Sequence, residues 1–237
     1  MRVVREKVGK IKIVKDGPYL VSGKVPLAKE ALICNREGIP QKWEGGAKYP
    51  NKESYALCRC GRSKDKPFCD GTHIKTGFDG TETASRKGYM EEAETISGPV
   101  LIMTDSPKLC AVACLCHRVE DAWSLTENSA DPVCRDQAVA EACDCPSGRL
   151  VAWDKKTGKP IEPDFEPSIG LIETAGTKDL GPIWVKGGVP IETSDGTQYE
   201  VRNRVTLCRC GQSKNKPFCD GTHATAGFTN KENGTPK

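Results

Sequence analysis

The chain has 237 residues, of which 37% are hydrophobic and 28% charged, and its formal net charge is +3. This length suits one large domain or two small ones with a buried core. The mild charge argues against nucleic-acid binding, and no stretch is apolar for long enough to predict a membrane span. Residues 1–17 lack the apolar segment of a secretory signal, so we expect a cytoplasmic protein.

Two stretches of the chain show the same order of short strands around a glycine turn. The first covers residues 17–27 and the second residues 181–191, and each has Gly-Pro at its start and Val-Pro near its end. Residues 55–57 and 205–207 predict further strands, each of which runs into a Cys-x-Cys pair. The sequence therefore predicts two small β modules. The first has 14 additional residues between Cys34 and Tyr49, which we interpret as a loop.

A sixteen-residue string, CRCGRSKDKPFCDGTH, occupies residues 58–73 and recurs at residues 208–223 with only two changes. A single buried cysteine or histidine is usually a packing residue, but thiolate and imidazole ligands repeated at fixed spacing are typical of metal sites. The candidate metal ligands are Cys58, Cys60, Cys69 and His73 in the first copy and Cys208, Cys210, Cys219 and His223 in the second.

Zinc is the main alternative metal, because three cysteines and one histidine satisfy a tetrahedral structural site. Zinc modules mostly take ligand pairs from two separate hairpins, whereas these four ligands come from one continuous loop. Within the first loop, Pro67 and the Asp70-Gly71 pair predict a sharp turn before the histidine. Ser63 could hydrogen-bond the bound metal group or cap a short helix that begins near Pro67.

The pattern resembles the CDGSH iron–sulfur domain of the NEET proteins, with Thr72 and Thr222 at the position that varies in that motif. The resemblance covers the full motif in both copies and implies a [2Fe-2S] cluster in each loop. It also implies how the ligands divide between the two irons of each cluster. One iron is bound by the Cys-x-Cys pair, Cys58 with Cys60 or Cys208 with Cys210. The other is bound by the later cysteine and the histidine, Cys69 with His73 or Cys219 with His223.

NEET relatives with one motif per chain resemble strand-swapped homodimers, so this chain is similar to such a dimer fused into one polypeptide. The expected fold is α+β and mainly β, with two modules that form an intrachain pseudo-dimer around one shared core. A small helical insertion should lie between them. Because the chain already contains both halves, we expect a monomer.

The ligand set also bears on redox chemistry. Three thiolates and a neutral imidazole make a [2Fe-2S] centre one unit less negative than four thiolates do. We therefore expect a potential between those of plant ferredoxins and Rieske centres, roughly −300 to 0 mV. Basic residues around both loops should form an exposed rim that could steer an acidic partner. They are Arg59, Arg62, Lys64, Lys66, Arg209, Lys214 and Lys216.

Residues 90–180 are not explained by the repeat and contain six cysteines. We predict a short helix over residues 108–117 and a second over 131–142, followed by a strand over 150–153 and a turn. Packing of reduced thiols would also account for the cysteines. Disulfides fit a reducing compartment poorly.

This segment resembles a ferredoxin, because its last cysteine precedes a proline in the sequence CPSGRL. It also resembles the divergent single-cluster domains found beside CDGSH motifs. The resemblance implies a third cluster bound by Cys110, Cys116 and Cys145. Since Ala113 occupies the middle ligand position, the set matches three-cysteine ferredoxins and favours [3Fe-4S] over [4Fe-4S]. A fourth ligand for [4Fe-4S] would have to come from Cys114, His117, Cys134 or Cys143.

The sequence predicts three parts: a first CDGSH-type module at 1–89, a cysteine-rich ferredoxin-like segment at 90–180 and a second CDGSH-type module at 181–237. The signatures of hydrolases and nucleotide-binding enzymes are absent, so we do not expect an enzyme. We expect an electron-transfer protein that works with a redox partner protein. Storage of clusters and their delivery to an apo acceptor is the alternative, because protonation of the single histidine would weaken its bond to iron. A structural zinc module is a further alternative.

Overall fold

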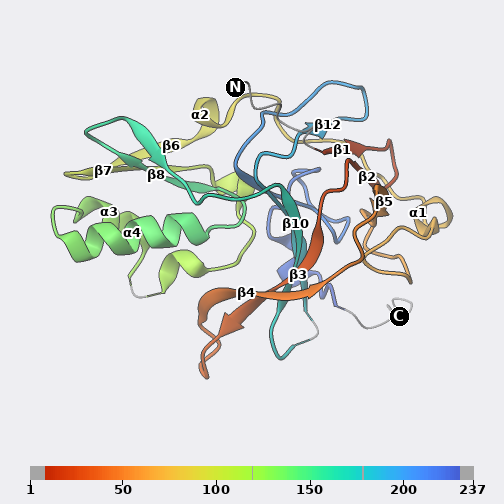
Figure 1. Cartoon of the computed structure of the whole chain (residues 1–237), viewed down its shortest axis with the longest axis horizontal. Helices are drawn as coiled ribbons and strands as arrows, with labels where there is room; N and C mark the ends of the chain where they lie inside the picture. Colours follow the sequence, from red (N-terminus) through yellow and green to blue (C-terminus); the bar gives the residue numbers. More distant parts are fainter. Residues whose placement is uncertain (1–8, 119, 178, 230–237) are drawn as a thin grey trace, which may run out of the picture.

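The computed structural model describes residues 9–118, 120–177 and 179–229, and within them the chain is mainly β with short helices in the middle. The strands form three sheets (Figure 1). No helix in these ranges is both long and apolar enough to cross a membrane.

The elements of the first module and the start of the central segment are β1 (Lys10–Ile13), β2 (Tyr19–Ser22), β3 (Leu27–Cys34), β4 (Pro40–Lys48), β5 (Ser54–Leu57), α1 (Thr72–Lys75), α2 (Tyr89–Glu92), β6 (Glu94–Ser97) and β7 (Leu101–Asp105). Two short 3-10 helices follow, η1 (Pro107–Leu109) and η2 (Leu115–His117). The remaining elements are α3 (Ala122–Glu127), α4 (Pro132–Asp144), β8 (Leu150–Asp154), β9 (Lys159–Ile161), β10 (Ser168–Thr174), β11 (Leu180–Lys186), β12 (Ile191–Glu192), β13 (Arg204–Leu207) and α5 (Thr222–Thr225).

The two modules exchange strands. One sheet has the order β12-β1-β2-β5, and the other has the order β13-β11-β10-β3-β4. Thus β3 of the first module pairs in parallel with β10, and β12 of the second pairs in parallel with β1. The exchanges use equivalent positions: the amide of Ile11 donates to the carbonyl of Pro190 at 2.9 Å, and that of Ile169 donates to the carbonyl of Pro26 at 2.8 Å.

This exchange confirms the predicted intrachain pseudo-dimer. The strand β10 lies N-terminal to residue 181, within the stretch that the sequence reasoning assigned to the central segment, and it pairs antiparallel with β11. Its place in the second sheet corresponds to that of β1 in the first.

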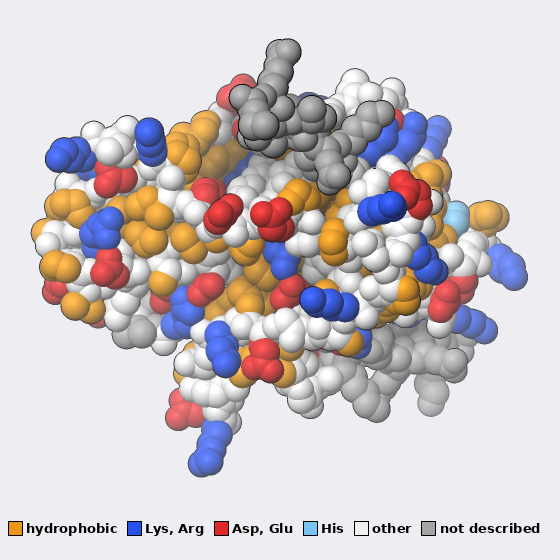
Figure 2. Space-filling view, in the orientation of Figure 1, with side chains coloured by type: hydrophobic (Ala, Val, Ile, Leu, Met, Phe, Trp, Pro, Cys, Tyr) orange, Lys and Arg blue, Asp and Glu red, His pale blue; other side chains and the backbone are white. Residues whose placement is uncertain are grey.

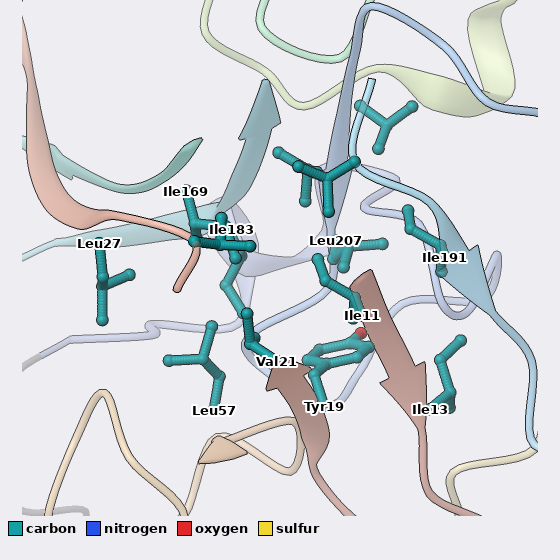
Figure 3. Close-up of a cluster of buried hydrophobic side chains, with 14 of the residues drawn as sticks. Ile11, Ile13, Tyr19, Val21, Leu27, Leu57, Ile169, Ile183, Ile191 and Leu207 are labelled. Carbon is teal, nitrogen blue, oxygen red and sulfur yellow. The ribbon is translucent and has the colours of Figure 1, made fainter. Parts of the chain in front are cut away.

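One core is shared by the two exchanged sheets. In β1, lysine alternates with isoleucine, and only the isoleucines are buried, as expected for a strand with one face against the core. Side chains from both modules meet there (Figure 3). They include Ile11, Ile13, Tyr19, Val21, Leu27, Leu57, Ile169, Ile183, Ile191 and Leu207.

The additional residues of the first module form a hairpin. The prediction of a loop was wrong, because β4 pairs antiparallel with β3 over most of its length. The indole of Trp43 explains why this strand is held: its Nε1 donates to the carbonyl of Asp144 at 2.9 Å, and its ring lies 5.0 Å from that of Trp184. The hairpin thus links the exchanged sheets to the central segment.

The central segment has its own sheet, in the order β6-β7-β8-β9, and α3 and α4 pack against it. The prediction of a helix over 131–142 is confirmed by α4, which Asp131 caps by accepting from the amide of Val133 at 2.8 Å. The predicted strand over 150–153 is confirmed by β8. The sequence reasoning missed α3.

The prediction of a helix over 108–117 was wrong. Two single 3-10 turns, η1 and η2, stand at its ends, and the chain between them is irregular. Val112 and Cys114 both have φ of 54°, in the left-handed region that side chains rarely adopt. The cysteines therefore lie on a loop with an unusual backbone.

Candidate metal centres

Each CDGSH loop directly follows a strand and is closed by backbone hydrogen bonds. In the first copy, β5 ends at Leu57, and the amide of Cys58 donates to the carbonyl of Pro67 at 2.8 Å. The amide of Cys69 donates back to Ala56 at 2.9 Å. The same two bonds occur in the second copy, between Cys208 and Pro217 at 2.7 Å and between Cys219 and Thr206 at 2.9 Å. The two ligand loops thus have the same frame.

The ligands of each loop lie in two pairs. The sulfurs of Cys58 and Cys60 are 3.7 Å apart, and Cys69 Sγ is 3.3 Å from His73 Nδ1. In the second copy the corresponding distances are 3.7 Å and 3.4 Å. Two cysteine sulfurs that bind one tetrahedral metal ion, each at about 2.3 Å from it, are separated by nearly the same distance as the sulfurs of each Cys-x-Cys pair. Two metal ions with two protein ligands each therefore fit each loop.

No group of three or more cysteine, histidine, aspartate or glutamate side chains in the described ranges is arranged to hold one metal ion.

The turn between the third cysteine and the histidine is built as expected. The carboxylate of Asp70 accepts from the amides of Lys64 at 2.8 Å and Thr72 at 2.9 Å, and these bonds hold the pKa of Asp70 well below its usual value. Gly71 has a φ of 83°, and α1 begins at the next residue.

No helix begins near Pro67 in the described residues, so Ser63 does not cap one. Ser63 instead donates to the carbonyl of Phe68 at 2.6 Å and accepts from the amide of Asp65, which tightens the loop itself. Ser213 makes the equivalent bonds in the second copy. Both serines are buried.

The loops favour the thiolate form of their first cysteine. The hydrogen bond between the two thiols lowers the pKa of Cys58, against the effect of burial, and raises that of Cys60. In the second copy the same bond lowers the pKa of Cys208 and raises that of Cys210. Thiolates are the form that binds metal.

The expected exposed rim is wrong for two of its members. Arg59 and Arg209 are only 1% and 3% exposed. Arg59 donates to the carbonyl of Gly80 at 2.5 Å, and its guanidinium lies over the rings of Tyr19 and Phe78. Burial lowers the pKa of Arg209, whose Nε and Nη1 have no hydrogen-bond partner. The residue after the first ligand is therefore part of the core rather than of the surface.

These buried guanidiniums fit an anionic group in the loops. A buried charge with unsatisfied donors is costly unless an opposite charge lies nearby. Glu173 is the main negative group that acts on Arg209, ahead of Cys58 of the first ligand loop. A [2Fe-2S] cluster with three thiolates is anionic and would add negative charge in the loops that carry these arginines.

The two loops meet at the pseudo-two-fold axis. A Cβ built on Gly61 would lie 2.5 Å from the carbonyl oxygen of Cys210, and one on Gly211 would lie 2.6 Å from that of Cys60. A cavity of about 280 Å³ lies beside this contact, and its lining includes ligands of both copies. The glycines after the Cys-x-Cys pairs thus permit direct backbone contact between the two sites.

Tyr19 joins the first module to the second ligand loop. Its hydroxyl lies 2.9 Å from the carbonyl oxygen of Cys208 and 3.1 Å from that of Pro217, and it donates to them. Burial raises the pKa of this phenol well above its usual value. The equivalent residue of the second module is Ile183, so the first loop receives no such bond from it.

The central cysteines converge on a small apolar cavity of about 30 Å³. Its lining includes the three cysteines predicted as ligands and also Cys114, which the sequence reasoning named only as one of several candidates for a fourth ligand. The cavity cysteines are Cys110, Cys114, Cys116 and Cys145. Burial and the charge of Cys145 raise the pKa of Cys116 to about 12.

The other candidate fourth ligands lie outside this cavity. Cys143 donates to the carbonyl of Ile161 at 3.6 Å, Cys134 packs against the core of the central segment, and His117 lies against the ring of Trp123. Proximity therefore favours Cys114.

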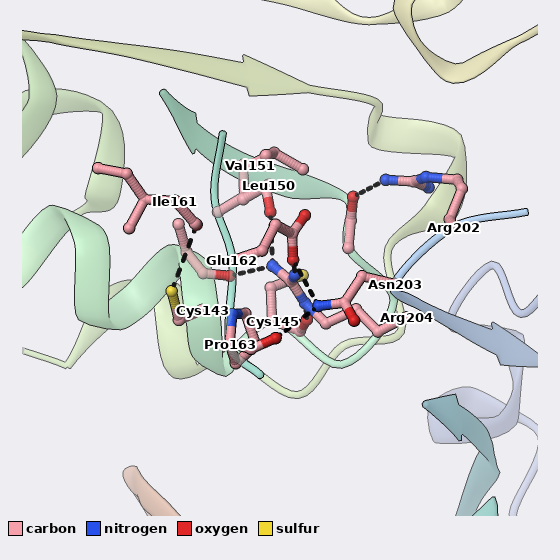
Figure 4. Close-up of polar contacts among 12 residues, drawn as sticks. Cys143, Cys145, Leu150, Val151, Ile161, Glu162, Pro163, Arg202, Asn203 and Arg204 are labelled. Carbon is pink, nitrogen blue, oxygen red and sulfur yellow. Dashed lines mark hydrogen bonds and ion pairs between the residues drawn. The ribbon is translucent and has the colours of Figure 1, made fainter. Parts of the chain in front are cut away.

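Two arginines support the central site. Arg149 forms two bonds with Asp105, at 2.6 and 2.8 Å, and these bonds, together with the neighbouring Cys110, raise the pKa of the guanidinium. Arg204 of β13 is 2% exposed and donates to the carbonyls of Cys145 and Ala142 at 2.7 Å each and of Leu150 at 3.1 Å (Figure 4). It thereby fixes the turn that presents Cys145. Sequence reasoning missed Arg204, since a lone arginine in a strand carries no pattern.

These loops and this cavity define a protein built to hold metal centres. Residues 16–74 and 180–224 match the family model described as iron-binding zinc finger CDGSH type, and residues 96–155 match one described as divergent 4Fe-4S mono-cluster. The chain is therefore an iron–sulfur protein in which two CDGSH-type regions flank a divergent 4Fe-4S region, as the sequence resemblance predicted. Neither a comparison with curated proteins nor one with solved structures gave a match.

Proposed function

We propose that the chain carries single electrons between a redox partner protein and its own clusters, with two [2Fe-2S] centres and one centre in the middle segment. The observation that carries this proposal is the pairing of ligands in each loop, in which a buried arginine follows the first cysteine. A buried cationic group favours the more negative, reduced state of a nearby cluster. Because thiolate ligands need a reducing compartment, we place this function in the cytoplasm.

The test is iron and sulfide analysis of the anaerobic protein, followed by repeated one-electron reduction and reoxidation monitored by EPR. We expect reversible spectra with the iron content unchanged after several cycles. A colourless protein with zinc and no sulfide would instead support the structural zinc alternative. Loss of iron in every cycle would contradict electron transfer.

The nuclearity of the central cluster gives a separate prediction. The set of Cys110, Cys116 and Cys145 alone suits [3Fe-4S], whereas Cys114 on the same cavity would complete [4Fe-4S]. We propose Cys114 as the fourth ligand and expect about eight irons per chain, falling to about seven in Cys114→Ala. The matched control Cys134→Ala should keep the full count. About seven irons in both the unmodified chain and Cys114→Ala would show that Cys114 is not a ligand. The central cluster would then be [3Fe-4S], bound by the other three cysteines.

Delivery of clusters to an apo acceptor is the second candidate, and the exposure of the first site favours it. Cys69 is partly exposed whereas Cys219 is only 3% exposed. A ligand at the surface is more easily exchanged for that of another protein. Transfer of one cluster per chain to an apo-ferredoxin, without added reductant, would support this function.

Acid should release the two clusters at different rates. Burial lowers the pKa of His223, so protonation of this ligand requires a lower pH, and the second cluster should persist to lower pH than the first. We expect visible absorbance to bleach in two phases near pH ~5.5 and to be stable near pH ~8. His73→Cys should remove the fast phase and His223→Cys the slow one. A single phase that both substitutions slow equally would contradict this expectation.

A further inference from the structure

The two CDGSH loops have nearly identical sequences but different surroundings. In the second, a Cβ built on Gly221 would collide with the side chain of Val112 and lie 3.2 Å from the carbonyl oxygen of Cys110. In the first, nothing lies within 4 Å of a Cβ on Gly71. The loop that carries the central cysteines therefore packs directly on the second CDGSH loop and not on the first.

One of the two sequence differences between the loops, Asp65 in the first and Asn215 in the second, lies at this contact. Asn215 donates from its Nδ2 to the carbonyl oxygen of Lys108 at 3.0 Å, two residues before the first central ligand. Its counterpart in the first loop is Asp65, which is exposed. An ionised aspartate has no hydrogen to donate to a carbonyl, so only the second copy has the residue that this contact needs.

A single strand connects the second loop to the central site. β13 begins with Arg204, which holds the carbonyl of Cys145, and ends at Leu207, next to the ligand Cys208. In the first module the equivalent strand, β5, begins with Ser54. Among the residues that the structure describes, no strand links the first loop to the central cysteines in this way.

The first loop faces outward instead. Ile74, the residue after His73, is 77% exposed, and its counterpart in the second loop is Ala224. Figure 2 shows a histidine and a hydrophobic side chain at the edge of the molecule where Figure 1 has α1. Ile74 is thus a large apolar side chain that a partner protein docking beside His73 would contact.

We propose that the three centres form an ordered line, in which the first CDGSH site exchanges electrons with a one-electron redox protein and the second CDGSH site lies between it and the central site. This inference rests on the proposed electron-transfer function. The contact of Gly61 and Gly211 with the opposite Cys-x-Cys pair joins the first site to the second. Each step moves one electron, so that one centre is oxidised as its neighbour is reduced, and the partner protein supplies or accepts that electron at the first site.

EPR relaxation of variants that each lack one [2Fe-2S] cluster tests this order. In Cys69→Ala, the remaining second-site signal should relax severalfold faster when the central cluster is paramagnetic, and a dysprosium chelate in the solvent should affect it little. In Cys219→Ala, the EPR signal of the first site should respond in the opposite way. The chelate should speed its relaxation strongly, and the central cluster should speed it only weakly. Equal responses in the two variants would overturn the order.

Glycine variants provide the same comparison with all ligands in place. Gly221→Ala and Gly71→Ala each put a side chain at a similar positive φ, of 85° and 83°, but only the first pushes against Val112. We expect Gly221→Ala to weaken the spin coupling to the central cluster and Gly71→Ala to leave it unchanged. Equal coupling in both would overturn the proposal. A protein without iron or sulfide would instead refute the proposed function itself, which keeps the two failures distinct.

Discussion

Alanine at Gly61 should destabilise the protein more than alanine at a glycine of positive φ whose Cβ position is open. Its φ is 75°, and the new Cβ would lie 2.5 Å from the carbonyl oxygen of Cys210 across the pseudo-two-fold axis. Strain of the backbone and displacement of a ligand loop together should cost about 3 kcal/mol or more, which lowers the thermal midpoint by roughly 6–12 °C in a chain of this size. The midpoint of cluster bleaching on heating measures the effect.

Gly77→Ala is the matched control. Gly77 also has a positive φ, of 56°, but nothing lies within 4 Å of its Cβ position. This variant carries the backbone strain alone, which is about 1–2 kcal/mol, and should lower the midpoint by roughly 2–8 °C. Equal midpoints for the Gly61 and Gly77 variants would show that the two loops do not press on each other.

Replacing Arg204 by methionine should empty the central site while both CDGSH sites keep their iron. The substitution preserves much of the side-chain volume but removes the donors to the carbonyls of Cys145, Ala142 and Leu150. Each hydrogen bond from a charged donor contributes about 1.5–3 kcal/mol, so the turn that holds Cys145 should lose its fixed position. Iron should fall to about four atoms per chain, the content of two [2Fe-2S] clusters.

Arg135→Met tests the specificity of this effect, because Arg135 lies on α4 and its side chain forms an ion pair with Asp136 at the surface. We expect this variant to keep its full iron content and its EPR signals. A central cluster that survives Arg204→Met would mean that the cysteines hold their positions without the arginine.

The pairing of candidate ligands within each of the two loops could be predicted from sequence because the repeat and its turn residues are local. The cysteine spacing, Asp70-Gly71 and the strands before each loop specify their geometry within about twenty residues, and short-range patterns of this kind are the most reliable. The exchange of strands followed from the resemblance to swapped dimers, but the sequence did not predict which strands β3 and β12 pair with.

The features that sequence reasoning missed depend on distant contacts. The apolar spacing in residues 108–117 suggested a helix, but Val112 and Cys114 take left-handed conformations that present cysteines to a cavity shared with Cys145. The sequence suggested that Arg59 is a surface charge, but the fold buries it and places its guanidinium over two aromatic rings. The hairpin of β4 has mostly exposed residues, so no alternation of buried side chains marked it as a strand.

The strand exchange within one chain has a consequence for dilute solution. In a dimer of separate chains, swapped strands pair only as long as two molecules meet, so folding and cluster retention depend on protein concentration. Here the strands β3 and β12 are tethered to the sheets that they join, and pairing occurs at the effective concentration set by the connecting chain, on the order of millimolar for short linkers. A few copies of this protein in a cell would hold both halves together as firmly as many copies would.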